Sequence, residues 1–283
     1  LLVPEAMDGV GLGQVELALV LIEQGRGLVA LPLWQNALAA LALGEASGER
    51  LALAIDGDVT ATESNDGWTL HGKAVAVAGA GESARLVTVA DGRLFIVDLQ
   101  GAGIARSDGV LTDGQASSDL SFTGTPARVL AHDAAWLLAR AAACVAALAV
   151  GVARGAVERT AVYVGTRHQF DRPIGSFQAV AQRMADAFTD VEVAQTLAME
   201  LAWRIDAGAD LGTSVEVATY WANQCSHRVA HAAMHLHGGI GADTSYPIHR
   251  VLLMSRALEM MLGGPHRQIA RIGVGRKFGP DQR

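Results

Sequence analysis

RHQFDRPIGSFQAVAQRMAD, the stretch from Arg167 to Asp186, places an arginine, two phenylalanines and a glutamine next to a proline and a glycine. It lies between two long segments in which apolar residues recur at helical spacing. A surface loop would need only the proline and the glycine to turn the chain. Arg167, however, offers a rigid fork of donors that suits a pyrophosphate, and Phe170 and Phe177 could support an aromatic ring system. The stretch therefore predicts a loop between helices that carries part of a ligand site.

Helical spacing on both sides of this stretch predicts a bundle. Four long helices are expected at 133–164, at 176–207, from 213 to the Gly238–Gly239 pair, and at 247–262. Because short loops join them, we expect antiparallel neighbours. The most apolar run, 134–157, is rich in alanine and is interrupted by Arg140 and Arg154. A buried bundle helix explains it better than a membrane span, so no membrane partner is expected.

The N-terminal part of the chain has two different patterns. Helical spacing from Gln14 to Leu43, broken near Pro32, predicts two short helices. Between Leu51 and Leu130, short alternating or β-branched runs bounded by Gly, Asp, Asn or Ser predict antiparallel strands of a barrel or sandwich. The expected fold is therefore α+β, with three domains: a partial N-terminal helical domain (1–46), a middle β-domain (47–131) and a C-terminal four-helix bundle (132–283).

Composition narrows the class of protein. With 283 residues, 51% of them hydrophobic, the chain can form a sizeable core. A net charge of -7, with 22 basic residues spread thinly, leaves no basic stripe for nucleic acid. Cys144 and Cys225 lack disulfide or metal-ligand spacing, which is typical of a reducing compartment, and we expect a cytoplasmic protein. The chain starts at Leu1 without a basic region, which we interpret as a trimmed N-terminus rather than a signal peptide.

Two short patterns suggest a ligand but have a simpler interpretation. AVAGAGESA, at 76–84, has the glycine spacing of a dinucleotide site, but a strand pattern follows it where a helix would be required, so a turn is favoured. His227, His231 and His235 share one helix face without an acidic or cysteine ligand at helical spacing. Interhelical hydrogen bonding is favoured over metal binding, and for His235 a place beside a polar ligand at the helix end.

HLHGGIGADTSYP, from His235 to Pro247, ends one helix with three glycines and leads into the next with a proline. A helix stop alone would justify one glycine. Adjacent Gly238 and Gly239 allow the backbone to approach another group closely, and a phosphate-bearing ligand is the commonest reason. This loop is the second candidate part of the ligand site.

Taken together, these motifs resemble those of the acyl-CoA dehydrogenase family of flavoproteins, in the same order along the chain. LLVPEAMDGVGLG is similar to the family's VPEEYGGLG, and DGWTLHGKAVAVAGAGESARLVTVA to its DGWVLNGRKTWVTGA…ADLLLV. RHQFDRPIGSFQAVAQRMAD resembles RxQFGxPIGxFQAVQHxLAD, and HLHGGIGADTSYPIHR resembles QxxGGxGYxxEYPxER. The last two motifs are long and specific.

The resemblance implies an FAD site and a reaction. Arg167 and Gln178 match residues that hold the ADP half of FAD, and Phe170 and His235, singled out above from the residues alone, are further candidate contacts to the cofactor. The backbone from His237 through Gly238 to Gly239 would contact the cofactor from a neighbouring subunit. The implied reaction is removal of the α-proton of an acyl-CoA thioester by a carboxylate, with hydride passing from Cβ to flavin N5. The partners implied are an acyl-CoA and an electron-transfer acceptor.

The chain departs from the family where the base should be. The YEGT motif that carries the catalytic glutamate is replaced by LGGPHRQ, which places Gly263 at that position. The alternative base position on the first long helix is occupied by Ala141. Glu259 precedes Gly263 by one helical turn, and we expect for it a solvated salt bridge rather than a role as base. The TEPxAGSD strand beside flavin and thioester has no counterpart, and LALAIDGDVTATE stands in its place.

These departures predict a non-catalytic subunit in a heteromeric acyl-CoA dehydrogenase, an α2β2 tetramer in which a sister chain supplies the base. The resemblance extends to steroid-catabolic enzymes of actinobacteria, so a steroid-derived acyl group is one expectation. Two alternatives stay open: a self-sufficient dehydrogenase with a displaced base, and a structural subunit that binds no flavin.

Overall fold

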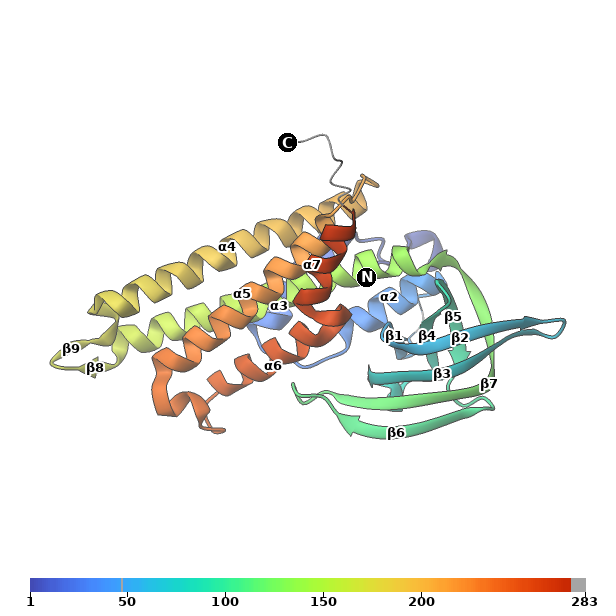
Figure 1. Cartoon of the computed structure of the whole chain (residues 1–283), viewed down its shortest axis with the longest axis horizontal. Coiled ribbons are helices and arrows are strands. Elements are labelled where there is room, and N and C mark those ends of the chain that lie inside the picture. The colour runs from blue at the N-terminus through green and yellow to red at the C-terminus, as the bar shows by residue number, and fades with distance from the viewer. Residues whose placement is uncertain (47, 276–283) are drawn as a thin grey trace. The chain divides into compact units, whose positions relative to one another are not determined.

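A computed structural model describes residues 1–46 and 48–275 of the chain (Figure 1). The chain forms two compact units, the first from Leu1–Leu17 and Ala30–Ala141 and the second from Ala18–Val29 and the residues from Ala142 onward. The first unit contains the large sheet and the second contains most of the helical residues. Because two helices contribute to both units, the division into three domains remains a prediction.

The two predicted N-terminal helices are present. A 3-10 turn, η1 (Glu5–Met7), precedes α1 (Gln14–Arg26) and α2 (Leu33–Leu43). Pro32 directly precedes α2, where its fixed φ and missing N–H are tolerated. Gly44 then ends the helix in the left-handed conformation, at φ 68°.

Seven strands form the sheet of the first unit. They are β1 (Leu51–Ala54), β2 (Gly57–Ser64), β3 (Gly67–Ala78), β4 (Arg85–Ala90), β5 (Arg93–Asp98), β6 (Ile104–Val110) and β7 (Ala116–Asp133), with the 3-10 turn η2 (Ala80–Glu82) after β3. The order is β1-β4-β5-β7-β3-β2, and β6 also pairs with β7. The first part of β7 pairs with β3 and β6 and its last part with β5, so β7 joins the two halves of the sheet. AVAGAGESA lies at a turn between strands, as predicted.

One feature of the sheet differs from the prediction, and a second could not be located by it. β1 and β4 run parallel, whereas all the other pairs in the sheet are antiparallel. Alternation along a strand carries no information about the direction of its partner, so the sequence could not indicate this pair. The strand β6 lies inside the region predicted to form strands, but it is exposed along almost its whole length and has no apolar alternation that would mark its position.

The second unit contains the predicted long helices and one more. In order the elements are α3 (Ala134–Thr166), β8 (His168–Gln169), β9 (Arg172–Pro173), η3 (Ile174–Ser176), α4 (Gln178–Asp206), α5 (Ser214–His237), η4 (Gly238–Ala242), α6 (Ile248–Met260), η5 (Met261–Gly263) and α7 (Gly264–Gly275). The helix α5 packs on α4, α6 and α7. We missed α7 because Gly263, Gly264 and Pro265 look like a stop, although proline is equally compatible with the first turn of a new helix.

The helix α3 is long and apolar enough to cross a membrane by length and composition alone. However, 78% of its most apolar 18-residue window is buried inside the protein. A helix that is apolar on all sides is expected at the centre of a helical unit. The structure therefore supports the prediction of a buried bundle helix over that of a membrane span.

Glycines allow the second part of α1 to lie directly against α3. A Cβ atom added at Gly25 would overlap the Leu148 carbonyl, and one added at Gly151 would overlap the carbonyl of Ile22. One added at Gly155 would lie 2.6 Å from the Arg26 carbonyl oxygen. These distances leave no room for side chains, so the two backbones are in contact.

Neither cysteine forms a disulfide within residues 1–46 and 48–275, and both are buried in the helices. Cys144 lies on α3 and is fully buried. Cys225 lies on α5, where burial, together with the charge of Asp190, raises the pKa of the thiol to about 12. A thiol of this kind is protonated and unreactive at neutral pH.

Candidate cofactor site

The connection between α3 and α4 is a tight hairpin with an exposed aromatic tip. Strands β8 and β9 pair through His168–Pro173 and Gln169–Arg172, with Phe170 and Asp171 as the two turn residues. Both turn residues have positive φ, 54° and 63°, as a type I′ turn requires. The Phe170 side chain is 86% exposed, although its ring contacts the edge of the Phe177 ring at 6.1 Å between centroids. A strained, exposed phenylalanine is suited to contact a group outside this chain.

The other two residues predicted for the ADP half lie on the same connection. The N–H of Arg167 donates to the Tyr163 carbonyl and its own carbonyl accepts from the N–H of Ile174, both at 2.8 Å. These bonds fix its backbone, while its side chain is exposed and makes no ion pair within the described part of the chain. Gln178 is the first residue of α4 and is also exposed.

The connection is stabilised from within. The guanidinium of Arg172 lies 4.0 Å from the centroid of the Phe177 ring, which is a cation–π contact. Ser176 donates to the carbonyl of Pro173 at 2.7 Å. The exposed groups are therefore presented from a rigid loop.

The second candidate loop begins at the end of α5. His235 is exposed, whereas His237 is buried, with 3% of its surface accessible. Gly238 has φ 63° and ψ -143°, a conformation open only to glycine. Gly239 differs, because its φ is not positive and an added Cβ would meet nothing within 4 Å. Within the described chain, nothing requires glycine at position 239.

The position matching the usual base lies in an unfavourable turn for a carboxylate. Leu262, Gly263 and Gly264 have successive positive φ values of 57°, 85° and 72°. A Cβ at Gly263 would overlap the side chain of Arg267. The alternative position, Ala141, is fully buried on α3. Neither position provides a base, and neither backbone site could accept an ionised carboxylate without strain or desolvation.

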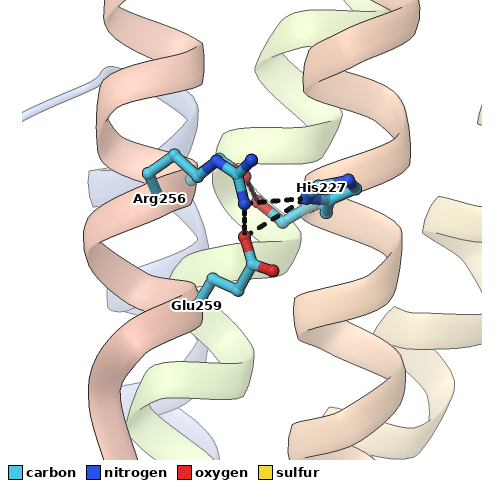
Figure 2. A network of polar contacts seen from close by, with 5 residues as sticks. His227, Arg256 and Glu259 are labelled. Atoms are coloured by element: carbon cyan, nitrogen blue, oxygen red, sulfur yellow. Dashed lines mark hydrogen bonds and ion pairs between the residues drawn. The ribbon is translucent and has the colours of Figure 1, made fainter. Parts of the chain in front are cut away.

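Glu259 is engaged in a network that links α5 to α6 (Figure 2). Its carboxylate accepts from Arg256 Nη1 at 2.6 Å and lies 3.2 Å from His227 Nδ1. Burial raises the pKa of Glu259, but the hydrogen bonds from Arg256 and His227 outweigh it and hold the pKa below its ordinary value. The expected salt bridge is present, but it is not solvated, since only 15% of the Glu259 side chain is exposed. The side chain lies between two helices rather than on the open surface, which the helical pattern could not indicate.

The histidines that were predicted to share one helix face, His227, His231 and His235, have different surroundings in the structure. His227 makes the interhelical contact just described, which confirms the preferred interpretation for that residue. The ring of His231 lies 4.5 Å from that of His227, and burial lowers its pKa. Within residues 1–46 and 48–275, no three His, Cys, Asp or Glu side chains are arranged to hold a metal ion.

One departure on β3 escaped the sequence analysis. Aligning DGWTLHGKAVAVAGA with the family pattern DGWVLNGRKTWVTGA places Ala76 at the tryptophan and Ala78 at the second threonine. Ala76 lies in a bulge of β3 with φ 55°, and its N–H donates to Asp119 Oδ1 at 2.8 Å. The strand therefore presents two methyl groups where the pattern has a ring and a hydroxyl. Both alanines are visible in the sequence at positions where the family motif has a tryptophan and a threonine.

Comparison with known proteins identifies the class. Residues 131–275 match the family described as Acyl-CoA dehydrogenase, C-terminal domain. Two relatives from Mycobacterium tuberculosis are the acyl-CoA dehydrogenases FadE27 and FadE28. FadE27 is 34% identical over 95% of this chain and 83% of its own length. FadE28 is 30% identical over 96% of this chain and 87% of its own length. The chain belongs to the acyl-CoA dehydrogenase family.

Solved structures support the same assignment. The Tcur3481–Tcur3483 steroid acyl-CoA dehydrogenase (G363A variant) superimposes with a TM-score of 0.92 at 34% identity, covering 96% of this chain and 83% of that one. The ChsE4–ChsE5 complex from Mycobacterium tuberculosis superimposes with a TM-score of 0.89 at 32% identity, and the match covers 98% of this chain and 84% of the chain in that complex. The predicted family and fold class are confirmed.

Proposed function

We propose that the chain is the non-catalytic subunit of a heteromeric, FAD-dependent acyl-CoA dehydrogenase. The observation that carries the proposal is the state of the two base positions. Gly263 lies in a left-handed turn and Ala141 is fully buried, so this chain has no carboxylate at either position. Two structurally similar proteins carry paired names, ChsE4–ChsE5 and Tcur3481–Tcur3483, which favours a two-chain assembly here as well.

The residues present fit one half of the cofactor. An ADP group needs donors for the pyrophosphate, backbone that can be approached closely, and a flat surface beside the purine. Arg167, Gly239 and Phe170 offer these three features and are exposed, and Gln178 and His235 are exposed as well. Arg167 would hold the pyrophosphate, and the backbone of His237 through Gly239 would contact the same half from the neighbouring subunit.

The residues present do not fit the other half. Ala76 and Ala78 offer no ring and no hydroxyl beside a flavin. LALAIDGDVTATE, which stands in place of the TEPxAGSD segment, begins with β1, whose four residues are all buried, and continues into the largely exposed strand β2. We therefore propose that the flavin ring and the thioester are held mainly by a sister chain.

The division of chemistry follows from this fit. FAD, when bound, accepts the hydride from the thioester's Cβ. The chain described here would bind and orient the cofactor's phosphate-bearing half, and the sister's carboxylate would remove the α-proton. The Tcur3481–Tcur3483 protein is described as a steroid acyl-CoA dehydrogenase, and on this basis we propose a steroid-derived acyl-CoA as substrate.

Co-expression with a glutamate-bearing sister chain tests the proposal. We expect the complex, but not the isolated chain, to bind FAD and oxidise an acyl-CoA, with a native mass corresponding to an α2β2 tetramer. Arg167→Ala should lower the flavin content of the complex by about tenfold or more, because a charge-assisted contact of about 1.5–3 kcal/mol is lost. Tyr220→Phe, on α5, is a control that should not change it.

Other results would favour the alternatives. Turnover by the isolated chain would support a self-sufficient enzyme with a displaced base. An active complex whose flavin content is unaffected by Arg167→Ala would support a structural subunit without a cofactor contact.

A further inference from the structure

Two aromatic side chains hold the end of α5 at the start of the glycine loop. Tyr163 comes from α3, and His237 is the last residue of α5. Their rings stack at 4.2 Å between centroids, with 22° between their planes. The ring of Tyr246, which precedes α6, lies 5.5 Å from that of His237. All three residues belong to the second unit.

The hydrogen bonds of His237 define its protonation state. Its Nδ1 lies 2.8 Å from the Ala233 carbonyl oxygen, which can only accept, so Nδ1 carries a hydrogen. Its Nε2 is buried and has no hydrogen-bond partner within the described part of the chain. Burial lowers the pKa of His237, although the bond to Ala233 opposes this effect. The folded protein therefore contains the neutral imidazole, because a second N–H would be buried without an acceptor.

The same pair fixes the backbone that leads into the loop. The Tyr163 hydroxyl donates to the His237 carbonyl at 3.3 Å. That carbonyl belongs to the peptide that joins His237 to Gly238. Gly238 has φ and ψ values that only glycine adopts. The N–H of this peptide bonds back to the carbonyls of Met234 and His235, so the peptide sets the direction in which the chain continues to Gly239, and both glycines are exposed residues.

We propose that Tyr163 and His237 are positioning residues that aim the Gly238–Gly239 backbone at the pyrophosphate-bearing half of the cofactor, and that protonation of His237 releases this hold. The inference rests on the proposed function, because it names what orients the site proposed above. Neither side chain needs to touch the cofactor. Tyr163 holds the His237 carbonyl by a hydrogen bond, and the buried His237 ring, stacked on Tyr163, holds the end of α5 in place.

Within the described part of the chain, no carboxylate contacts the His237 ring, and the Ala233 carbonyl is the group that favours its charged form. The titratable side chains in ring contact are Tyr163 from α3 and Tyr246 from the segment before α6, and neither is a carboxylate. On its own helix, His235 is exposed. Near Tyr246, the Asp243 carboxylate accepts from Ser245, and His249 Nδ1 lies 2.7 Å from the Tyr246 carbonyl. An imidazolium at position 237 would therefore keep its bond to Ala233 but would have a buried Nε2–H without an acceptor among the described residues.

The direction of the pH effect follows from these contacts. An accessible histidine gains a proton near its ordinary pKa of 6.5, whereas His237 in the folded loop resists it. As the pH falls through 6.5, the protonated form favours states in which the ring has left its buried position. Cofactor affinity should therefore be constant above pH 7 and fall below about pH 6.5.

The test measures FAD affinity of the assembled complex from pH 5.5 to 8 by flavin fluorescence. We expect the wild-type dissociation constant to rise between pH 7.5 and 5.5, by at most about tenfold for one histidine with an ordinary pKa of 6.5 in the released state. Tyr163→Phe should weaken binding several-fold at pH 7.5 and keep the pH dependence, because the stacked ring remains and the hydrogen bond is lost. His237→Phe should weaken binding at pH 7.5 and remove most of the pH dependence. Tyr220→Phe is the matched control and should behave like the wild type.

Two outcomes would overturn the inference. The first is His237→Phe with the wild-type pH dependence, and the second is Tyr163→Phe with wild-type affinity at every pH. Arg167→Ala separates these failures from failure of the proposed function. We call the contact between Tyr163 and His237 the clamp. If Arg167→Ala weakens FAD binding but Tyr163→Phe and His237→Phe do not, only the role proposed for the clamp is wrong. If Arg167→Ala also binds FAD like the wild type, the cofactor site itself is wrong.

Discussion

Glu259 is the acidic side chain nearest in sequence to the missing base, and its contacts indicate a structural role. Its carboxylate is shared by Arg256 and His227, and it lies between α5 and α6. A general base must be free to take a proton, whereas these two donors favour the ionised form that is already bonded. The geometry of Glu259 therefore favours a role in stabilising the contact between α5 and α6 rather than a role in proton transfer.

Glu259→Gln should leave the turnover of the assembled complex unchanged and lower the free energy of unfolding at pH 7 by about 1–2 kcal/mol, since charge-assisted hydrogen bonds are weakened. The pKa of Glu259 is depressed in the folded chain. Its stabilisation is therefore complete above the ordinary pKa of 4.5 and is lost as the pH falls through the folded value. Urea unfolding at pH 7 and at pH 4 checks both statements. Loss of turnover with an intact, flavin-loaded complex would instead assign Glu259 a role in catalysis.

Gly263→Glu tests whether the family base can simply be restored. We expect no turnover by the isolated chain and a loss of about 1–2 kcal/mol in stability, because a residue with a Cβ is strained at φ 85° and would displace Arg267. Gly273→Glu adds the same charge on α7 at a position where a Cβ meets nothing, so it should be neutral. Activity in the Gly263 variant alone would show that the flavin and thioester sites of this chain are complete.

At the scale of elements, the contact between α1 and α3 depends on glycine. Gly151→Ala should destabilise the chain by about 1–3 kcal/mol, because the added methyl group overlaps the Ile22 carbonyl and the helices must separate. Gly165→Ala lies on the same helix in open space and should be neutral or stabilising by up to about 1 kcal/mol. Thermal unfolding of the two variants side by side measures the difference. Equal melting temperatures would show that the backbones are not in contact.

The elements that the sequence predicted best are those with a strong period and clear ends. Each of the helices α3 to α6 was placed within about two residues, because apolar residues recur at helical spacing over long segments. The strand β6 was not located individually because exposure removes the alternation that marks a strand. The helix α7 was missed because the residues that stop α6 also begin the next helix.

The candidate site could be predicted only where the chemistry lies in a short motif. Arg167, Phe170 and Gln178 share one loop and are all exposed, so the motif located them together. The clamp of Tyr163 on His237 joins residues 74 positions apart, and no local pattern indicates it. The open space beside Gly239 is also invisible in sequence, since it depends on how the rest of the chain folds around that position.

At the scale of the whole molecule, the prediction concerns the number of active sites. Because this chain lacks both base positions, we expect one competent site for each pair of unlike chains. Replacing the sister's glutamate with glutamine should abolish turnover while leaving the mass and flavin content of the complex unchanged. Residual activity above that of the uncatalysed reaction would mean that this chain contributes a base of its own.

The buried thiols of Cys144 and Cys225 allow the rate of local opening of the helical unit to be measured. Cys225 is 1% exposed with a pKa raised to about 12, and Cys144 is fully buried, so neither thiol should react with an alkylating reagent while the helices are closed. Alkylation then requires an opening event, and its rate at saturating reagent equals the opening rate. We expect labelling to be slow in the isolated chain and slower still with the sister bound, as followed by mass spectrometry. Labelling at the rate of a free thiol would show that α5 is not packed as described.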